Sequence, residues 1–312
     1  MGVARATACL IPAAILSVLA MAGAAAAAPP FAFDFAGPGT PPPGALGAVG
    51  GDVAVDSEGS VWVEDPTENR VVKYDYNGGF IAGFTQPEGL PTAFVDTNGL
   101  GTDDRGGVYV VDDGTRVVKI DLGGRHVRTY GIGGPAPQLS AADVAVGADG
   151  VVHVLEAGRI ARYRQDGTAL PDVILPGSVA DGLDLVVAPS GEYYVNTASR
   201  IVRLSPAGAE TGAIPVFNAG EGLAADTSQP ALRIYGRTGF EGQIREYAAD
   251  LTPVGTLTST EVSVPTGIAV DCRGTVYVVD RSPAGSRVLK FDDPATPPPP
   301  CAPPAAPPGV VD

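Results

Sequence analysis

The stretch that decides the fold is residues 52–74, which read DVAVDSEGSVWVEDPTENRVVKY. It contains an apolar segment (VAVD), an Asp-x-x-Gly turn, an alternating apolar and aromatic segment (VWV), a variable loop, and a third segment that opens with Arg70. Each segment has the length of a short strand, and Gly59 can adopt the positive φ that a tight turn needs. The stretch therefore predicts three antiparallel strands.

The same pattern recurs along the chain. Residues 100–120 read LGTDDRGGVYVVDDGTRVVKI, residues 144–163 read VAVGADGVVHVLEAGRIARY, residues 185–204 read LVVAPSGEYYVNTASRIVRL, and residues 268–291 read IAVDCRGTVYVVDRSPAGSRVLKF. The arginines that open the third strand are Arg70, Arg116, Arg159, Arg200 and Arg287, with spacings of 46, 43, 41 and 87 residues. The double gap predicts a worn sixth copy over residues 221–247, with Gln243 in the arginine position.

Weaker fourth strands are expected at residues 80–84, 126–130, 173–175, 214–217 and 254–257. Four short strands at a period of about 40–45 residues are typical of a propeller blade. The sequence therefore predicts an all-β fold, a six-bladed β-propeller of four-stranded antiparallel blades over residues 44–293.

The last blade is predicted to take its fourth strand from the amino-terminal end of the propeller. The last copy runs into proline after Phe291, whereas a lone strand, FAFDF at residues 31–35, precedes the first copy. Residues 29–43 are expected to supply this closing strand and a linker, and closure removes exposed sheet edges. Residues 294–312 are too rich in proline for a sheet and are expected to form an extended or disordered tail.

The amino-terminal segment indicates export. Arg5 precedes an apolar run, and a stretch of small residues follows, so residues 1–28 are predicted to be a cleaved signal peptide. The alternative is a permanent membrane anchor, although the run is short for a span. The protein is expected to be secreted, either free or associated with the cell wall. In that oxidising compartment Cys272 and Cys301 are expected to form a disulfide, and two free thiols are the alternative.

The net charge of −15 restricts the partners. An acidic surface repels phosphate backbones and anionic lipid, which argues against nucleic acid and, after signal removal, against a membrane. The expected partner is a protein, peptide or glycan, and the protein is expected to be a monomer.

The repeats resemble the NHL family of propellers, through the pattern apolar-Ala-Val-Asp-x-x-Gly-x-Val-Tyr-Val-x-Asp followed by Arg-Val-x-x-Tyr. The resemblance covers residues 50–292 and is strong in units one, two and six, weaker in three and four, and poor in five. It implies a binding scaffold rather than one particular chemistry. The repeated scaffold residues include the turn aspartates Asp56, Asp103 and Asp271. The five repeated arginines are interpreted as braces within their blades, and the alternative is a site for an anionic ligand.

Few residues suit catalysis. The only histidines are His126 and His153, and no serine lies in a Gly-x-Ser-x-Gly motif. His153 takes the aromatic position of a second strand, which predicts a packed side chain. These counts argue against a Ser-His-Asp hydrolase and against a histidine-rich metal site.

One cluster of acceptor side chains is predicted at the mouth of the central channel, where the innermost strands begin. Its members are Asp52, Asn98, Asp143, Asp184 and Glu221. Hard oxygen ligands of this kind suit Ca²⁺ or Mg²⁺, and the alternative is a polar mouth filled with water. The turns at Asn98 and Glu221 resemble those of gluconolactonase/regucalcin-like propellers, which implies a metal-dependent lactonase. The sequence thus leaves three functions open: a binding scaffold, a lactonase-like hydrolase with a divalent cation, or an accessory sensor or structural protein of the cell wall.

Overall fold

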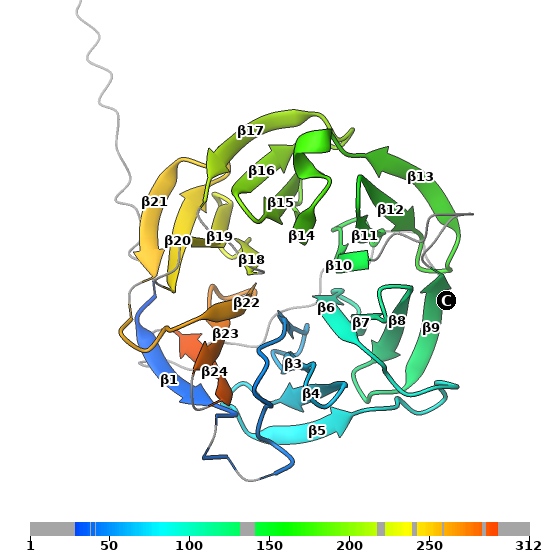
Figure 1. Ribbon diagram of the computed structural model, residues 1–312, viewed down its shortest axis with the longest axis vertical. Coiled ribbons are helices and arrows are strands. Elements are labelled where there is room, and N and C mark those ends of the chain that lie inside the picture. Colours follow the sequence, from blue (N-terminus) through cyan, green and yellow to red (C-terminus); the bar gives the residue numbers. More distant parts are fainter. Residues whose placement is uncertain are drawn as a thin grey trace, which may run out of the picture.

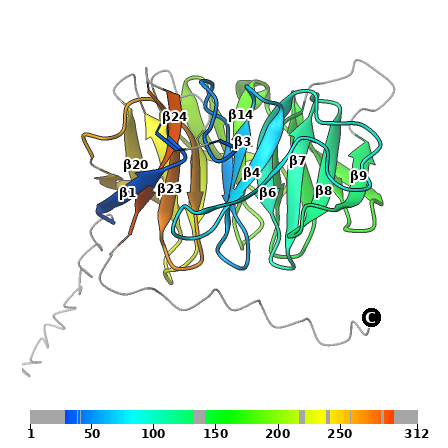
Figure 2. The same ribbon diagram turned by 90° about the horizontal axis from the view of Figure 1, so that it is seen from below.

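The computed structural model describes residues 29–292 except 38, 41, 132–140, 217–221, 239–241, 258 and 283–284. Six four-stranded antiparallel sheets stand around a central axis (Figures 1 and 2). The fold is therefore the six-bladed β-propeller that the repeats predict. The predicted signal peptide, residues 1–28, and the tail from residue 294 lie outside the described residues. No helix among the residues that the structure describes is long and apolar enough to cross a membrane.

The strands of the first three blades follow the chain from the inside of the ring outwards. Blade one contains β2 (Val53–Val55), β3 (Val61–Asp65), β4 (Arg70–Tyr74) and β5 (Phe80–Phe84). Blade two contains β6 (Thr97–Thr102), β7 (Gly107–Asp112), β8 (Arg116–Asp121) and β9 (His126–Gly131). Blade three contains β10 (Ala141–Val146), β11 (Val152–Glu156), β12 (Arg159–Tyr163) and β13 (Ala169–Ile174).

The remaining blades repeat this order, and a single 3₁₀ turn, η1 (Gly177–Val179), precedes blade four among the described residues. Blade four contains β14 (Gly182–Val187), β15 (Tyr193–Thr197), β16 (Arg200–Leu204) and β17 (Glu210–Pro215). Blade five contains β18 (Leu223–Asp226), β19 (Arg233–Thr238), β20 (Gln243–Ala248) and β21 (Pro253–Leu257). Blade six contains β22 (Pro265–Val270), β23 (Val276–Ser282), β24 (Gly285–Phe291) and the amino-terminal strand β1 (Phe31–Phe35).

The worn fifth copy folds as a complete blade, and β20 begins at Gln243 as predicted. Two outer strands begin earlier than predicted: β13 at Ala169 and β17 at Glu210. Their first residues are largely exposed and carry no regular apolar alternation, so only the apolar residues near the ends of these strands, such as Val173 and Ile214, stand out in the sequence.

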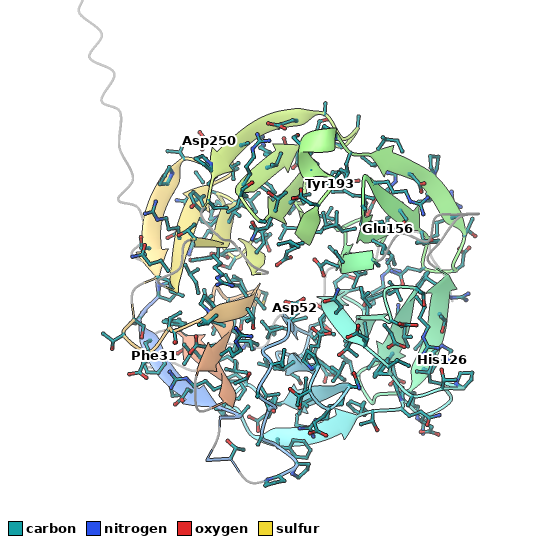
Figure 3. All side chains as sticks on the ribbon, viewed as in Figure 1. Phe31, Asp52, His126, Glu156, Tyr193 and Asp250 are labelled. Carbon is teal, nitrogen blue, oxygen red and sulfur yellow. The ribbon has the colours of Figure 1, made fainter. Side chains whose placement is uncertain are left out.

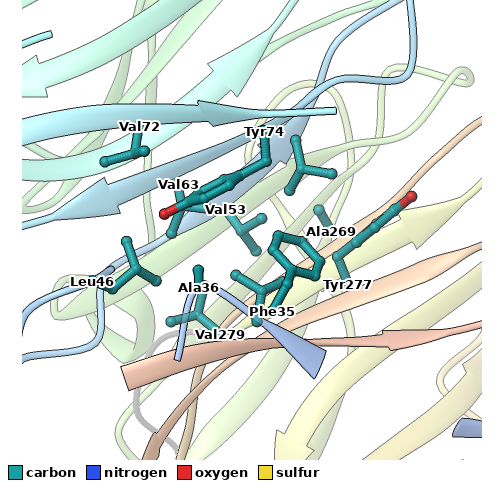
Figure 4. Close-up of a cluster of buried hydrophobic side chains, with 12 residues drawn as sticks. Phe35, Ala36, Leu46, Val53, Val63, Val72, Tyr74, Ala269, Tyr277 and Val279 are labelled. Carbon is teal, nitrogen blue, oxygen red and sulfur yellow. The ribbon is translucent and has the colours of Figure 1, made fainter. Parts of the chain in front are cut away.

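The ring closes between β1 and β24, which pair antiparallel with Phe31 opposite Phe291 and Phe35 opposite Val288. The end of β1 also packs into the seam between blades six and one. There Phe35 contacts the ring of Tyr74, with centroids 5.3 Å apart, inside a buried cluster that includes Val279 (Figure 4). The first strand of the propeller therefore stabilises both the last blade and its junction with the first.

Candidate functional site

The innermost strands surround a central channel with a cavity of about 220 Å³. Valine, alanine and leucine line most of its wall, because the VAV-type segments of the repeats form these strands. Asp52, Asp143 and Asp184 line the channel at the end where the innermost strands begin, which we call the entry face. Figure 3 shows Asp52 at the centre of the ring. The structure thus brings together three of the five predicted acceptors.

Each of these carboxylates joins its own blade to the next one. Asp52 accepts hydrogen bonds from the backbone N–H of Val53 (2.8 Å) and from that of Leu100 (3.0 Å), which lies in blade two. Asp143 links blade three to four in the same way, and Asp184 links four to five. Their donors are Val144 N (2.7 Å) and Leu185 N (2.8 Å) for Asp143, and Gly222 N (2.8 Å) and Leu223 N (2.7 Å) for Asp184. The aspartates therefore act as latches between blades.

The environment of the three carboxyl groups disfavours negative charge. Burial is the largest cause that raises the pKa of Asp52, Asp143 and Asp184 above the usual value for aspartate. The charge of Asp184 raises the pKa of the other two further, while the donated N–H bonds act in the opposite direction. Folding therefore favours the protonated cluster over the ionised one.

A further latch residue, Glu64, was not recognised in the sequence. Glu64 is only 3% exposed, and its carboxylate accepts hydrogen bonds from Asp52 N (3.0 Å) and from Gly99 N of blade two (3.3 Å). An alignment of the innermost strands cannot reveal it, because it belongs to the second strand. The antiparallel pairing of the first two strands could have indicated it, because this pairing places Glu64 beside Asp52, with Glu64 N donating to Asp52 O (2.9 Å).

The other two predicted acceptors do not join the described cluster. Asn98 is exposed and does not line the channel cavity, and Glu221 lies outside the described residues. Within the part of the chain that the structure describes, no three histidine, cysteine, aspartate or glutamate side chains are arranged to hold a metal ion. The carboxylate oxygens accept backbone N–H groups instead. The predicted Ca²⁺ or Mg²⁺ site, which includes Glu221, therefore stays a prediction.

Blades six, one and two share a second charged device on the entry face, which we call the loop clamp. It pairs the aspartate that ends the second strand with the arginine that opens the third. In blade two, Asp112 accepts hydrogen bonds from Val95 N (2.8 Å) and Asp96 N (3.3 Å) in the incoming loop. Arg116 binds Asp112 (2.7 Å) and donates to Ala93 O (3.3 Å) in the same loop. The aspartate thus holds N–H groups and the arginine holds a carbonyl.

The clamps of blades one and six use Asp65 with Arg70 and Asp280 with Arg287. Asp65 accepts from Gly47 N (3.2 Å), and Arg70 donates to Pro43 O (3.0 Å) and Ala45 O (2.7 Å). Asp280 accepts from Ser263 N (2.8 Å) and Val264 N (2.7 Å), and Arg287 donates to Glu261 O (2.6 Å). Asp65, Asp112 and Asp280 are all fully buried. In blade three, Arg159 pairs with Glu156, which ends the second strand in place of the aspartate and is buried, and the incoming loop over residues 132–140 lies outside the described residues. In blade four, Arg200 pairs with Glu210 of the outer strand.

At the opposite mouth, a cavity of about 340 Å³ is lined by the turn aspartates Asp56, Asp103 and Asp271. Each holds its Asp-x-x-Gly turn by accepting backbone N–H groups two and four residues further on. Cys272 also lines this cavity. Its predicted partner Cys301 lies outside the described residues, so the disulfide stays a prediction.

Blades one, two and six also share a lysine beside these turns. Lys73, Lys119 and Lys290 occupy the same register position, opposite Trp62, Tyr109 and Tyr277 of the neighbouring strand. In blade two, for example, Lys119 lies 2.9 Å from Asp103 and 5.0 Å from the centre of the Tyr109 ring. The equivalent cross-strand pairs in blades three, four and five are His153 with Arg162, Tyr194 with Arg203, and Tyr235 with Glu246.

Neither histidine lies at the channel. His153 is 4% exposed, its Nδ1 lies 3.3 Å from the Tyr193 hydroxyl, and burial lowers its pKa to about 4. His126 begins the outer strand β9, where its Nε2 contacts the Thr129 hydroxyl at 2.9 Å. His153 therefore has the packed environment that its position in the repeat predicts.

No family model matches the sequence, and no curated protein matches it either. Among solved structures, a streptogramin B lyase is similar at 19% identity and a TM-score of 0.54, covering 77% of this chain and 78% of the lyase. Virginiamycin B lyase from Staphylococcus aureus is similar at 17% identity and a TM-score of 0.57, covering 81% and 82%. A protein of unknown function from Bacteroides caccae follows at 12% and 0.53, covering 68% and 79%. At these identities the likeness concerns the propeller fold alone.

The lyase structures include a catalytically inactive variant of virginiamycin B lyase, with quinupristin, in which one histidine is replaced by alanine. In the present chain the two histidines lie on β9 and β11, away from the channel cavity. At 17% identity the likeness to this lyase concerns the fold alone and assigns no role to a residue of this chain.

Proposed function

We propose that the protein is an exported binding scaffold whose ligand, a protein, peptide or glycan, docks on the entry face. The observation that carries the proposal is the set of loop clamps in blades six, one and two. A surface whose loops are fixed before binding loses little conformational entropy when a partner docks. Variable loops on a rigid framework are also where proteins commonly place recognition.

The channel supports this proposal by the way its carboxylates are used. Asp52, Asp143 and Asp184 accept N–H groups that join neighbouring blades, and burial raises the pKa of each. Their described geometry serves the integrity of the ring. The NHL-like repeats and the predicted signal peptide are consistent with an exported interaction protein.

Array binding tests the proposal. The mature protein, fluorescently labelled through an added carboxy-terminal tag, is applied to peptide and glycan arrays. Saturable binding to one ligand class is expected, together with weaker binding by Asp112→Asn, which loosens one clamp. The matched control is Glu210→Gln, which alters the exposed ion pair of blade four. No binding to either array would contradict the proposal, as would metal-dependent hydrolysis of lactones by the purified protein.

The metal-dependent lactonase remains the alternative proposal. The observation that favours it is that three aspartates line the channel cavity, with no lysine or arginine among its described lining residues. If a divalent cation entered the cluster, it would lower the pKa of these carboxyl groups and stabilise the fold by mass action. Elemental analysis of the purified protein and a melting curve with added CaCl₂ or MgCl₂ test this. Bound metal and a rise in Tm that is lost in Asp184→Asn would favour the hydrolase over the scaffold.

A further inference from the structure

The entry-face loops of blades one and two expose an acidic and apolar surface. Val49 is 48% exposed and Val95 is 59% exposed, although most large apolar side chains of the propeller are buried. Glu68, Asp96 and Asp113 are exposed on the same loops. We call these five residues the acidic platform.

Backbone contacts hold the platform in place. Val49 N donates to the Thr67 hydroxyl (3.1 Å), which fixes the loop before blade one against the loop that carries Glu68. In blade two, Asp113 N donates to Asp96 O (2.7 Å), and both Val95 N and Asp96 N are held by the buried Asp112 clamp. The exposed side chains therefore project from a prearranged backbone.

The platform has little positive charge of its own. The entry-face loops of the two blades, residues 44–52, 65–70, 91–98 and 112–116, contain only two basic residues, Arg70 and Arg116. Both guanidinium groups are committed to their clamps, with side chains 15% and 24% exposed. The inner edge of the same surface leads to Asp52 and Glu64 at the channel mouth. The negative charge of the platform is thus left for an external cation.

We propose that the acidic platform binds a cationic, partly apolar polypeptide segment, with its basic side chains at Glu68, Asp96 and Asp113 and its apolar side chains against Val49 and Val95. The inference rests on the proposed scaffold function and specifies its surface and partner. Charge complementarity selects a basic partner, and the two exposed valines favour one that also carries apolar side chains. An anionic lipid surface or a nucleic acid would be repelled by this face.

Fluorescence anisotropy with two labelled decapeptides tests the inference. One alternates Lys and Val and the other alternates Glu and Val. The Lys-Val peptide is expected to bind saturably and to weaken at high salt, while the Glu-Val peptide does not bind. The triple variant Glu68→Gln, Asp96→Asn, Asp113→Asn is expected to weaken binding by about tenfold, on the scale of several exposed charge contacts. Val49→Ser with Val95→Ser is expected to weaken it by roughly threefold.

A matched triple variant, Glu58→Gln, Asp104→Asn, Asp149→Asn, removes the same charge from exposed positions near the opposite mouth and is expected to bind as the wild type does. Equal weakening by both triple variants would overturn the inference, because it would show a response to net charge alone. Unchanged binding by the platform variant would also overturn it. If the Lys-Val peptide does not bind but an arrayed ligand does, the platform inference fails while the scaffold function stands.

Discussion

Blades six, one and two differ from blades three, four and five in how they use charge. In the first half of the ring, each blade has a loop clamp on the entry face and an Asp-x-x-Gly turn with a neighbouring lysine at the opposite mouth. In the second half, Arg159 pairs with the buried Glu156 and Arg200 forms a more exposed pair with Glu210. The position of the lysine is taken there by Arg162, Arg203 and Glu246. The two halves share a backbone fold and differ in their buried polar networks.

This difference distinguishes the features that form a blade from the polar contacts that hold its loops. Apolar alternation and tight turns suffice to form all six blades, since the fifth folds without the arginine that opens the third strand elsewhere. The described loop clamps and the lysines beside the turns are an addition found in blades six, one and two. The comparison predicts unequal responses to matched substitutions in the two halves.

The largest expected effect is in the clamp of blade two. Asp112→Ala leaves Arg116 and two loop N–H groups without their buried acceptor, and it is expected to lower the free energy of unfolding by about 3–5 kcal/mol. Glu210→Ala breaks the exposed pair with Arg200 in blade four and is expected to cost less than about 1 kcal/mol. Urea unfolding at pH 7 measures both, and equal losses would remove the distinction between the halves.

Blade three has His153 at the position where blades six, one and two have tyrosine or tryptophan. The stability of the fold is therefore expected to depend on the pH through this residue. Burial lowers the pKa of His153 to about 4, from an ordinary value near 6.5. The unfolded chain therefore binds this proton first, and stability is lost as the pH falls from about 6.5 to about 4. The loss approaches about 3 kcal/mol at the acid end. His153→Tyr is expected to remove it.

The measurement is the difference in free energy of unfolding between the His153→Tyr variant and the wild type, at pH 7 and at pH 4.5. This difference should move in favour of the variant as the pH falls. The control is His126→Gln, which changes the exposed histidine of β9. A difference that stays constant with pH would contradict the role assigned to His153.

The latch aspartates extend the comparison to the second half of the ring, because two of the three, Asp143 and Asp184, belong to blades three and four. Their raised pKa means that the stability they contribute is fully present below the unfolded value near 3.8 and is lost as the pH rises through the folded value. Asp184→Asn keeps an acceptor for Gly222 N and Leu223 N but removes the charge. The variant is expected to be more stable than the wild type at pH 7 and to differ little from it near pH 4.

Thermal unfolding of this variant across pH 4–8 tests the expectation, with the nearby exposed substitution Asp181→Asn as the control. A lower Tm for Asp184→Asn at pH 7 would show that the ionised carboxylate stabilises the channel, and would contradict the raised pKa of Asp184.

The smallest expected effect compares two members of the first half. The Tyr109 hydroxyl lies 2.7 Å from both Asp103 and Gln165, so Tyr109→Phe is expected to cost about 1 kcal/mol. The buried Tyr277 hydroxyl has no hydrogen-bond partner among the described residues, and Tyr277→Phe is expected to be neutral or slightly stabilising. Denaturant midpoints of the two variants, measured in parallel, test both expectations. A larger loss of stability in Tyr277→Phe than in Tyr109→Phe would contradict them.

The sequence predicted the ring well because each blade is a local pattern. The Asp-x-x-Gly turns, the spacing of the arginines and the FAFDF strand fix the number of blades and their closure, and the structure confirms both. The blades that match the NHL-like pattern best are also those in which the structure describes clamps, since the aspartate that ends the pattern's second strand and the arginine that opens its third strand build them.

The candidate site was harder to predict. An alignment shows which residues face the channel but not what their oxygens bind, so the hydrogen bond from Leu100 N that occupies Asp52 could not be foreseen. Glu64 reaches the same mouth from the second strand, outside the set that the alignment compared. Contacts between blades depend on their relative placement, which no single repeat encodes.

The burial of the lysines has a consequence for the chemistry of the surface. The chain has only three lysines. Lys290 is 2% exposed, Lys73 is 6% exposed, and 15% of the Lys119 side chain is exposed. Apart from the chain's amino terminus, the folded ring offers almost no primary amine to an acylating reagent. Acylation of each lysine would therefore proceed through opening of its own blade, and its rate would report that opening in a protein that needs no engineered probe.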